Sequence, residues 1–438
     1  KSEYNFIIMK TKFFGLMALV ASILATTACQ KDNADDAWRQ IPVEQISVES
    51  GKAAVTVNDV TCSNGEVLLV ADSKDAGTLT LTGIVPGYSE VKMKVDLRKK
   101  SDDSFSFQGS TMVSTPPSVA ATLRSTDDNP CYAFRVEGTV KLDGTISMAV
   151  TTQVQGSYAA SLTGSWNVTR KCKVDQTGTP VGGPVQVTWK AAGAAAPAVA
   201  KASVYANIFG CLFAAELMDQ VTFDETGNIT ARYWAEPDLG DDPMATLKQL
   251  AKMIKPDADG NVTFSAHHTD WETSPKANLV FWYAMDNALF IVPNVSAIID
   301  AADAEETRTD IDGIDMSSVI EILATLKALG VDVDALNTEL QKVLTRGIEY
   351  KYTVNGQNLK IYVDKELCAP VIDALLPVLP TLDAVLEQLA QSHDPEDIKT
   401  LQTIKKIMDQ IGLQKPSDLD LVWKATTEFE IAYNFAKA

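Results

Sequence analysis

Apolar and polar residues alternate through the first third of the chain, which is the pattern of half-buried β-strands. Residues 78–82 read TLTLT, and residues 91–97 alternate in the same way. Asp143-Gly144 separates two further alternating runs and is a strong two-residue hairpin signal. No helical period interrupts residues 51–158. We therefore expect an all-β region there, either an antiparallel β-sandwich or an open barrel.

After residue 160 the pattern changes, because strand hairpins now alternate with helical periods. Helices are predicted at residues 203–219, 244–254, 315–329, 333–345, 365–391 and 395–411. Hairpins are predicted at residues 221–231, 279–292 and 348–363, and a last strand at residues 421–435. Three prolines are expected to kink the helix of residues 365–391. The chain as a whole is thus predicted to be α+β and β-dominated.

A short motif opens this second region. Residues 162–168 contain Gly164-Ser165-Trp166, which resembles the first strand of the calycin superfamily, where the Trp closes the floor of the barrel. The pattern is similar to lipocalin-like domains of uncharacterised Bacteroidetes surface lipoproteins. The resemblance implies that residues 160–438 form a calycin-like β-barrel with inserted helical hairpins.

The N-terminal pattern is that of an export signal. Residues 9–12 are MKTK, residues 13–25 are apolar, and small residues lead to Cys29. The apolar run of 13 residues is shorter than the roughly 20 that a membrane-spanning helix needs. We interpret residues 1–28 as a signal peptide that is removed.

The cysteine after that signal resembles the lipidated residue of a bacterial lipoprotein. Thr26 stands where such signals usually carry an aliphatic residue. Residues 30–36, QKDNADD, are similar to the acidic tag of surface-exposed Bacteroidetes lipoproteins, and a plain solvated linker is the alternative. The resemblance implies lipidation of Cys29, a tether over residues 29–50 and an outer-membrane location. A surface-exposed position is expected first and a periplasm-facing one second.

The charge excludes one class of partner. The formal net charge is −19. Residues 1–28 contribute Lys1, Lys10 and Lys12 against Glu3, so the processed chain is near −21 (−19 − 2). An acidic surface repels the phosphate backbone, so we expect no nucleic-acid partner.

Five cysteines remain besides Cys29. Cys62 and Cys131 flank strand-like segments of the first region, which makes them a candidate disulfide in an exported protein, with unpaired thiols as the alternative. Cys211 and Cys368 lie on apolar helical stretches and are expected to be buried thiols. No Cys-x-x-Cys motif occurs, so the sequence predicts no metal site of that kind.

Catalytic patterns are missing from the sequence. His267 and His268 lie on a predicted strand, so their side chains should point to opposite faces and not share a metal ion. Neither a nucleophile elbow nor a phosphate-binding loop occurs. The aspartate-rich residues 257–261 and 310–313 place glycine at the wrong position for an EF-hand and are read as turns. The sequence therefore predicts no cofactor and no enzyme.

Aromatic residues of the second region are the candidate ligand contacts. Trp234, Trp271 and Trp282 end or lie on predicted strands, where they either face a ligand or fill the core. We expect a non-catalytic surface lipoprotein that binds a glycan or an apolar small molecule. The alternatives are a protein that docks on an outer-membrane complex and a glycan hydrolase with dispersed carboxylates.

Overall fold

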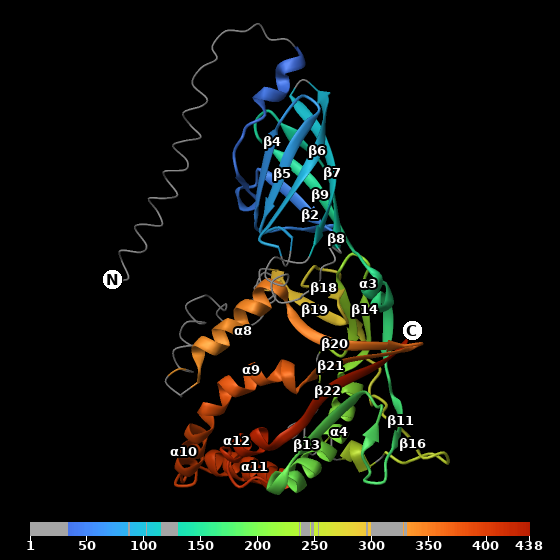
Figure 1. The fold of residues 1–438 in the computed structure, drawn as a ribbon, viewed down its shortest axis with the longest axis vertical. Coiled ribbons are helices and arrows are strands. Elements are labelled where there is room, and N and C mark those ends of the chain that lie inside the picture. The colour runs from blue at the N-terminus through green and yellow to red at the C-terminus, as the bar shows by residue number, and fades with distance from the viewer. Residues whose placement is uncertain are drawn as a thin grey trace.

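The computed structural model shows two β-rich lobes stacked along the long axis of the molecule (Figure 1). The structure describes residues 34–85, 88–101, 103–114, 130–235, 237, 246, 249–252, 254–294, 297–298, 327 and 331–438. The predicted signal peptide, Cys29, residues 310–313, part of the predicted helix at 244–254 and nearly all of the one at 315–329 lie outside these residues. The β-dominated α+β class is confirmed, because two curled half-barrel sheets make up most of the fold.

The first lobe is one sheet of nine described strands in the order β1-β4-β5-β6-β7-β8-β9-β2-β3. The sandwich alternative is therefore wrong for this region. β2 runs parallel to β9 on one side and antiparallel to β3 on the other. The strands are β1 (Ile46–Ser47), β2 (Ala53–Val57), β3 (Val60–Thr61), β4 (Glu66–Ala71), β5 (Ala76–Thr82), β6 (Glu90–Ser101), β7 (Ser104–Ser114), β8 (Pro130–Lys141) and β9 (Ile146–Val154).

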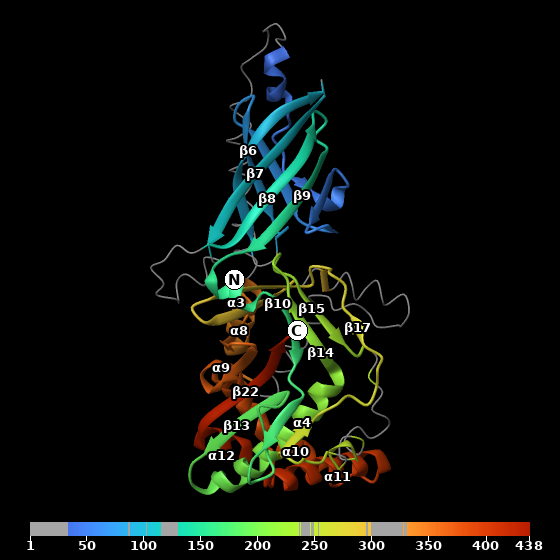
Figure 2. The same ribbon diagram turned by 90° about the vertical axis from the view of Figure 1, so that its right-hand side faces the viewer.

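The alternation seen in the sequence sets the two faces of this sheet. In β6 the odd positions 91–97 are buried and apolar, while the even positions 92–98 are charged and exposed. Figure 2 shows β6, β7, β8 and β9 side by side. Their outward residues form a continuous polar face.

The second lobe is built on a ten-stranded curled sheet. Its main path is β17-β15-β14-β10-β22-β21-β20-β19-β18, and β13 pairs with the long β22. An isolated bridge joins Asn228 to Phe281, so the two ends of the curled sheet approach each other. The strands are β10 (Gly164–Val168), β13 (Val185–Ala191), β14 (Met218–Phe223), β15 (Ile229–Tyr233), β17 (Glu272–Thr273), β18 (Val280–Met285), β19 (Ala288–Pro293), β20 (Ile348–Asn355), β21 (Asn358–Asp364) and β22 (Thr426–Lys437).

A small sheet and most of the helices lie beside this sheet, while the two short 3-10 helices within residues 34–50 lie in the first lobe (Figure 1). The small sheet contains β11 (Lys171–Val174), β12 (Pro180–Val181) and β16 (Asn261–Thr263). The helices are η1 (Ala34–Gln40), η2 (Val48–Ser50), α3 (Ser157–Leu162), η3 (Gly193–Ala195), α4 (Ala196–Leu217), α8 (Val333–Arg346), α9 (Lys365–Leu375), η4 (Leu376–Val378), α10 (Leu379–Leu389), α11 (Pro395–Ile411) and α12 (Asp418–Ala425).

Most helix predictions are confirmed within these bounds. The predicted helix of residues 365–391 is divided into α9, η4 and α10, with Pro377 inside the 3-10 turn. The prediction of a strand from residue 421 is wrong at its start. α12 continues to Ala425, and β22 begins only at Thr426.

The hairpin β18–β19 belongs to both lobes. Phe281, Tyr283 and Phe290 project from one face into the core of the first sheet. Trp282 and Leu289 project from the other face into the core of the second sheet. The first lobe therefore buries its apolar residues partly against a hairpin that lies more than 100 residues later in the chain.

Candidate functional site

Trp282 does not face a ligand. Its side chain is 0% exposed and its ring contacts Phe223 at a centroid distance of 5.2 Å. Its indole Nε1–H donates to the backbone oxygen of Asp224. A strand that is buried on both faces leaves no solvent-facing side for Trp282, so the ligand-facing prediction is wrong and core filling is correct at this position.

Trp234 and Trp271 are brought together, but around a histidine. The His268 ring stacks on Trp234 at 4.1 Å and lies 4.4 Å from Trp271. The Arg170 guanidinium lies over the Trp271 ring at 5.5 Å. Both tryptophans are half-buried. Each therefore uses a ring face in contacts within the protein.

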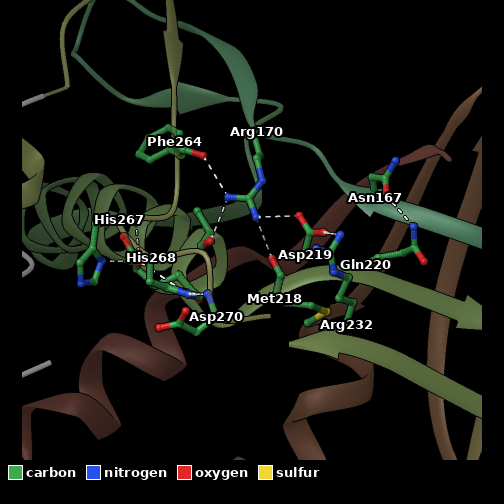
Figure 3. Close-up of polar contacts among 12 residues, drawn as sticks. Asn167, Arg170, Met218, Asp219, Gln220, Arg232, Phe264, His267, His268 and Asp270 are labelled. Atoms are coloured by element: carbon green, nitrogen blue, oxygen red, sulfur yellow. Dashed lines mark hydrogen bonds and ion pairs between the residues drawn. The ribbon is translucent and has the colours of Figure 1, made fainter. Parts of the chain in front are cut away.

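The two adjacent histidines contact the same residue, which corrects the opposite-face prediction. Residues 265–268 are not a strand, and both side chains contact Glu216. Figure 3 shows the two histidines close together, with Asp270 beside His268. His267 Nδ1 lies 2.6 Å from Glu216 Oε2. The Asp270 N–H donates to His268 Nδ1, so the proton of His268 is assigned to Nε2, which donates to the Glu216 backbone oxygen at 2.8 Å.

This cluster fastens a loop to the end of α4. Glu216 is 1% exposed, and its Oε1 has no hydrogen bond within the described part of the chain. Arg170 donates to the backbone oxygens of Ala215 and Met218 and pairs with Asp219, as Figure 3 shows. These contacts satisfy carbonyls at the helix end that have no partner inside the helix. The arrangement braces the loop against the end of α4.

The candidate disulfide between Cys62 and Cys131 is not formed, because Cys62 is a free thiol. Cys62 lies in the same cross-strand row as Gly138 of β8. The Cys62 N–H donates to the Val55 oxygen, Val55 pairs with Met148, and Met148 pairs with Gly138. Cys131 lies seven residues further along β8, roughly 23 Å away at strand spacing, far beyond the reach of a disulfide. The side chain of Cys131 lies outside the described residues.

The described thiols are shielded from solvent. Burial raises the pKa of Cys62 to about 11 and that of Cys211 to about 12, because a thiolate is poorly solvated there. Cys211 is fully buried, as expected, and Cys368 is half-buried. The reactive thiolate form is therefore disfavoured at Cys62 and Cys211 near neutral pH.

A broad hollow lies elsewhere, on the outward face of the first sheet. It measures about 630 Å³ and crosses β6, β7, β8, β9, β2 and β3. A second hollow of about 480 Å³ shares Asp96 and Gln108 with it and extends toward Arg135. We call the larger hollow the polar trough. The side chains that line it with hydrogen-bonding groups are Thr56, Thr61, Asp96, Arg98, Ser106, Gln108, Glu137, Thr139 and Ser147.

Strand register arranges these side chains in two rows perpendicular to the strands. Asp96 pairs with Gln108, Gln108 with Glu137, and the row continues through Ala149 to Thr56. A parallel row starts at Arg98 and runs through Ser106, Thr139 and Ser147 to Ala54. Register thus turns residues that are far apart in sequence into one continuous surface.

The polar groups of these rows are available. Among the described residues, the side chains of Asp96, Arg98, Gln108 and Glu137 form no hydrogen bond or ion pair with the rest of the protein, and all four are exposed. Lys94, at the rim, is instead paired with Asp72 at 2.9 Å. That contact lowers the pKa of Asp72. The four free groups therefore comprise two carboxylates, one guanidinium and one amide, which gives a net charge of −1 (+1 − 2).

Two glycines sit beneath the trough at inward positions. A Cβ on Gly138 would lie 2.5 Å from the Phe107 ring and 2.7 Å from Met148. A Cβ on Gly109 would lie 2.5 Å from the backbone oxygen of Lys94. Because neither strand carries a side chain there, each backbone lies close to its neighbours on the core side. We attribute the hollowing of the outer face to this approach.

Sequence analysis missed the polar trough. The alternation in β6 and β8 already placed Asp96, Arg98 and Glu137 on the outward face. The available signal was the pair of inward glycines, Gly109 and Gly138, inside otherwise regular strands. The order of the strands, which aligns these residues into rows, could not be predicted from the sequence.

The chain has no counterpart that names its function. Comparison with protein-family models, with curated proteins and with solved structures finds no match. Within the described residues, no group of three or more His, Cys, Asp or Glu side chains is arranged to hold a metal ion. The candidate site therefore rests on its own geometry.

Proposed function

We propose that the protein is a non-catalytic, lipid-anchored binding protein that holds a glycan in the polar trough. The observation that supports this is the hollow of about 630 Å³ lined by unpaired donors and acceptors. Ligand sites in proteins usually measure some 300–1,000 Å³. The site thus lies on the first sheet and not at the tryptophans of the second.

The lining chemistry favours a hydroxyl-rich ligand over an apolar one. The carboxylates of Asp96 and Glu137 accept hydrogen bonds, Arg98 donates them, and Gln108 does both. Sugar hydroxyls also donate and accept, so neighbouring hydroxyls match such mixed rows. Phe107 is the aromatic residue among the lining side chains, and its ring is buried beneath the trough.

The second lobe fits the proposed calycin-like barrel in several respects. β10 pairs with β22, so the first and last strands of the region lie together. Trp166 of the Gly-x-Trp motif is buried, and Lys437 Nζ lies 4.3 Å from its ring centroid. The interior is filled by the protein's own side chains, including Trp166, Trp282 and Phe223. We infer that this lobe has a structural role and does not hold a ligand in its interior.

Glycan binding should depend on Glu137. Isothermal titration of the full chain with cellohexaose, xylohexaose, mannohexaose and maltohexaose should show binding to at least one of them. Glu137→Gln should weaken that binding roughly 10- to 100-fold, because hydrogen bonds to a charged acceptor contribute about 1.5–3 kcal/mol. Glu90→Gln is the control. Glu90 lies on β6, on the same outward face of the sheet as Glu137 but outside the trough, so its substitution should leave the affinity unchanged.

Two outcomes of that titration contradict the proposal. Wild-type protein that binds none of the four sugars up to millimolar concentration removes the glycan function. Release of shorter sugars from any of them replaces a binding protein with a hydrolase.

The anchor is tested separately, because Cys29 lies outside the described residues. Cys29→Ala should shift the protein from the membrane to the soluble fraction, since each buried methylene of a lipid chain contributes about 0.8 kcal/mol. Cys368→Ala is the control and should stay with the membrane. A Cys29→Ala protein that still sediments with the outer membrane would exclude lipid anchoring.

A role in assembly is the second candidate function, and one surface favours it. Helices α9 and α10 expose apolar side chains that ordinarily mark a contact surface. These are Val371 (41%), Leu375 (39%), Leu382 (40%) and Val385 (42%). Residues 365–389 are also long and apolar enough to cross a membrane, by length and composition alone. The sugar titration discriminates, because an assembly protein should bind none of the hexasaccharides.

A further inference from the structure

The shape of the polar trough indicates which part of a glycan it takes, an inference that rests on the proposed glycan-binding function. One row of lining residues crosses six strands, from Asp96 on β6 to Thr61 on β3. Five inter-strand spacings of about 4.8 Å give a length of roughly 24 Å. That length spans several sugar rings in line, and a single ring would contact only part of it.

The trough is open along its side. Its central acidic and basic side chains are exposed, and its floor is the sheet itself. A chain can therefore enter sideways, without leading with an end. A site for a chain terminus would need a wall that stops the last ring. The lining residues all lie on the sheet strands and show no such wall among the described residues.

The charges of the trough select among glycans. Arg98 is cationic, Asp96 and Glu137 are anionic, and none of the three is paired with the described protein. Arg135 lies in the adjoining hollow and not in the trough. Lys94 is neutralised by Asp72. The free charges of the trough sum to −1 (+1 − 2), so a chain of uronic acids or sulfated sugars gains no net attraction, while a neutral chain meets donors and acceptors throughout.

We propose that the polar trough binds an internal segment of a neutral, linear polysaccharide, which lies across β6 to β3 and contacts several subsites. The central subsites are formed by Gln108 and Glu137. The terminal subsites are formed by Asp96 and Arg98 at one end and by Thr56 and Thr61 at the other.

Affinity should rise with chain length. Titration with a series from one to six units of the sugar that the wild-type protein binds should show weak binding of the monosaccharide and a steady gain up to the longer members. Thr56→Val should weaken the hexasaccharide about fivefold, the effect of one lost hydrogen bond. It should leave the trisaccharide unchanged, if that shorter chain occupies the central subsites. Thr151→Val is the control, because Thr151 lies on the same outward face of the sheet but outside the trough. It should change the affinity for neither the trisaccharide nor the hexasaccharide.

The outcomes separate this inference from the proposed function. A monosaccharide that binds as tightly as the hexasaccharide leaves glycan binding intact and refutes the extended site. Preference for a terminal sugar, seen as lost binding when the non-reducing end is blocked, refutes the internal-segment mode. Tighter binding of polygalacturonate than of the neutral hexasaccharides refutes the neutral class. Failure of all sugars to bind removes the function itself.

Discussion

Phe290→Ala should lower the free energy of unfolding by about 3–5 kcal/mol and destabilise both lobes together. Phe290 belongs to β19 of the second sheet, but its side chain is 0% exposed in the core of the first. Its ring stacks on Tyr283 at 4.7 Å. Removal of the ring leaves a cavity at the surface that both lobes share, so neither can keep its packing while the other unfolds.

Hydrogen exchange during a urea titration measures this effect region by region. Peptides from β6–β7 and from β20–β22 should report the same midpoint in the wild-type protein, and the same lowered midpoint in the variant. Leu421→Ala is the control, because Leu421 is 67% exposed and its loss should shift neither midpoint. A first lobe that unfolds early in the variant while β20–β22 keep the wild-type midpoint would show two independent domains.

This shared hairpin shows where inference from sequence stops. The alternation of residues 281–283 puts Phe281 and Tyr283 on one face of the strand and Trp282 on the other, as the structure shows. The pattern describes faces but not the partners of those faces. It therefore gave no sign that each side of β18 packs in a different core, or that Trp282 lacks a solvent side.

Local signals were more dependable than distant ones. Hairpins form at both Asp143-Gly144 and Asn355-Gly356, and Gly144 and Gly356 supply the positive φ, +86° and +61°, that each turn requires. Asn355 itself is the last residue of β20. The Cys62–Cys131 pairing failed because it depended on the order of strands, which only tertiary contacts determine. The histidine pair failed because residues 265–268 were assumed to be extended.

Part of the candidate site follows from local sequence patterns, and part depends on the order of the strands. Alternation alone placed Glu137 and Arg98 on the outward face, and the inward Gly138 marked an irregular position in β8. Register across β6, β7, β8, β9 and β2 then combined these residues into the polar trough. The parallel pairing of β2 with β9 supplies one end of it, and no local pattern predicts that pairing.

Asn278→Ala should cost about 2–4 kcal/mol, because its side chain joins the two lobes through buried hydrogen bonds. Its Nδ2 donates to the backbone oxygen of Val57 in the first sheet at 2.6 Å. Its Oδ1 accepts from Asn228 Nδ2 in the second lobe at 2.8 Å. Asn278 is 5% exposed and Asn228 is 1% exposed. Truncation therefore removes both hydrogen bonds in a buried region and leaves Asn228 Nδ2 with only its longer contact to Thr226 Oγ1 at 3.3 Å.

Asn287→Ala is the matched control for this experiment. Both asparagines have positive φ, +53° for Asn278 and +61° for Asn287, so both substitutions place alanine in the strained left-handed region. Asn287 is exposed in the β18–β19 turn. Chemical denaturation gives the loss in the free energy of unfolding for each variant. Because the strain of alanine at positive φ is common to both, the difference between the two losses measures the buried hydrogen bonds of Asn278. Equal losses would mean that the amide network contributes nothing to holding the lobes together, and the shared apolar hairpin would then be their principal connection.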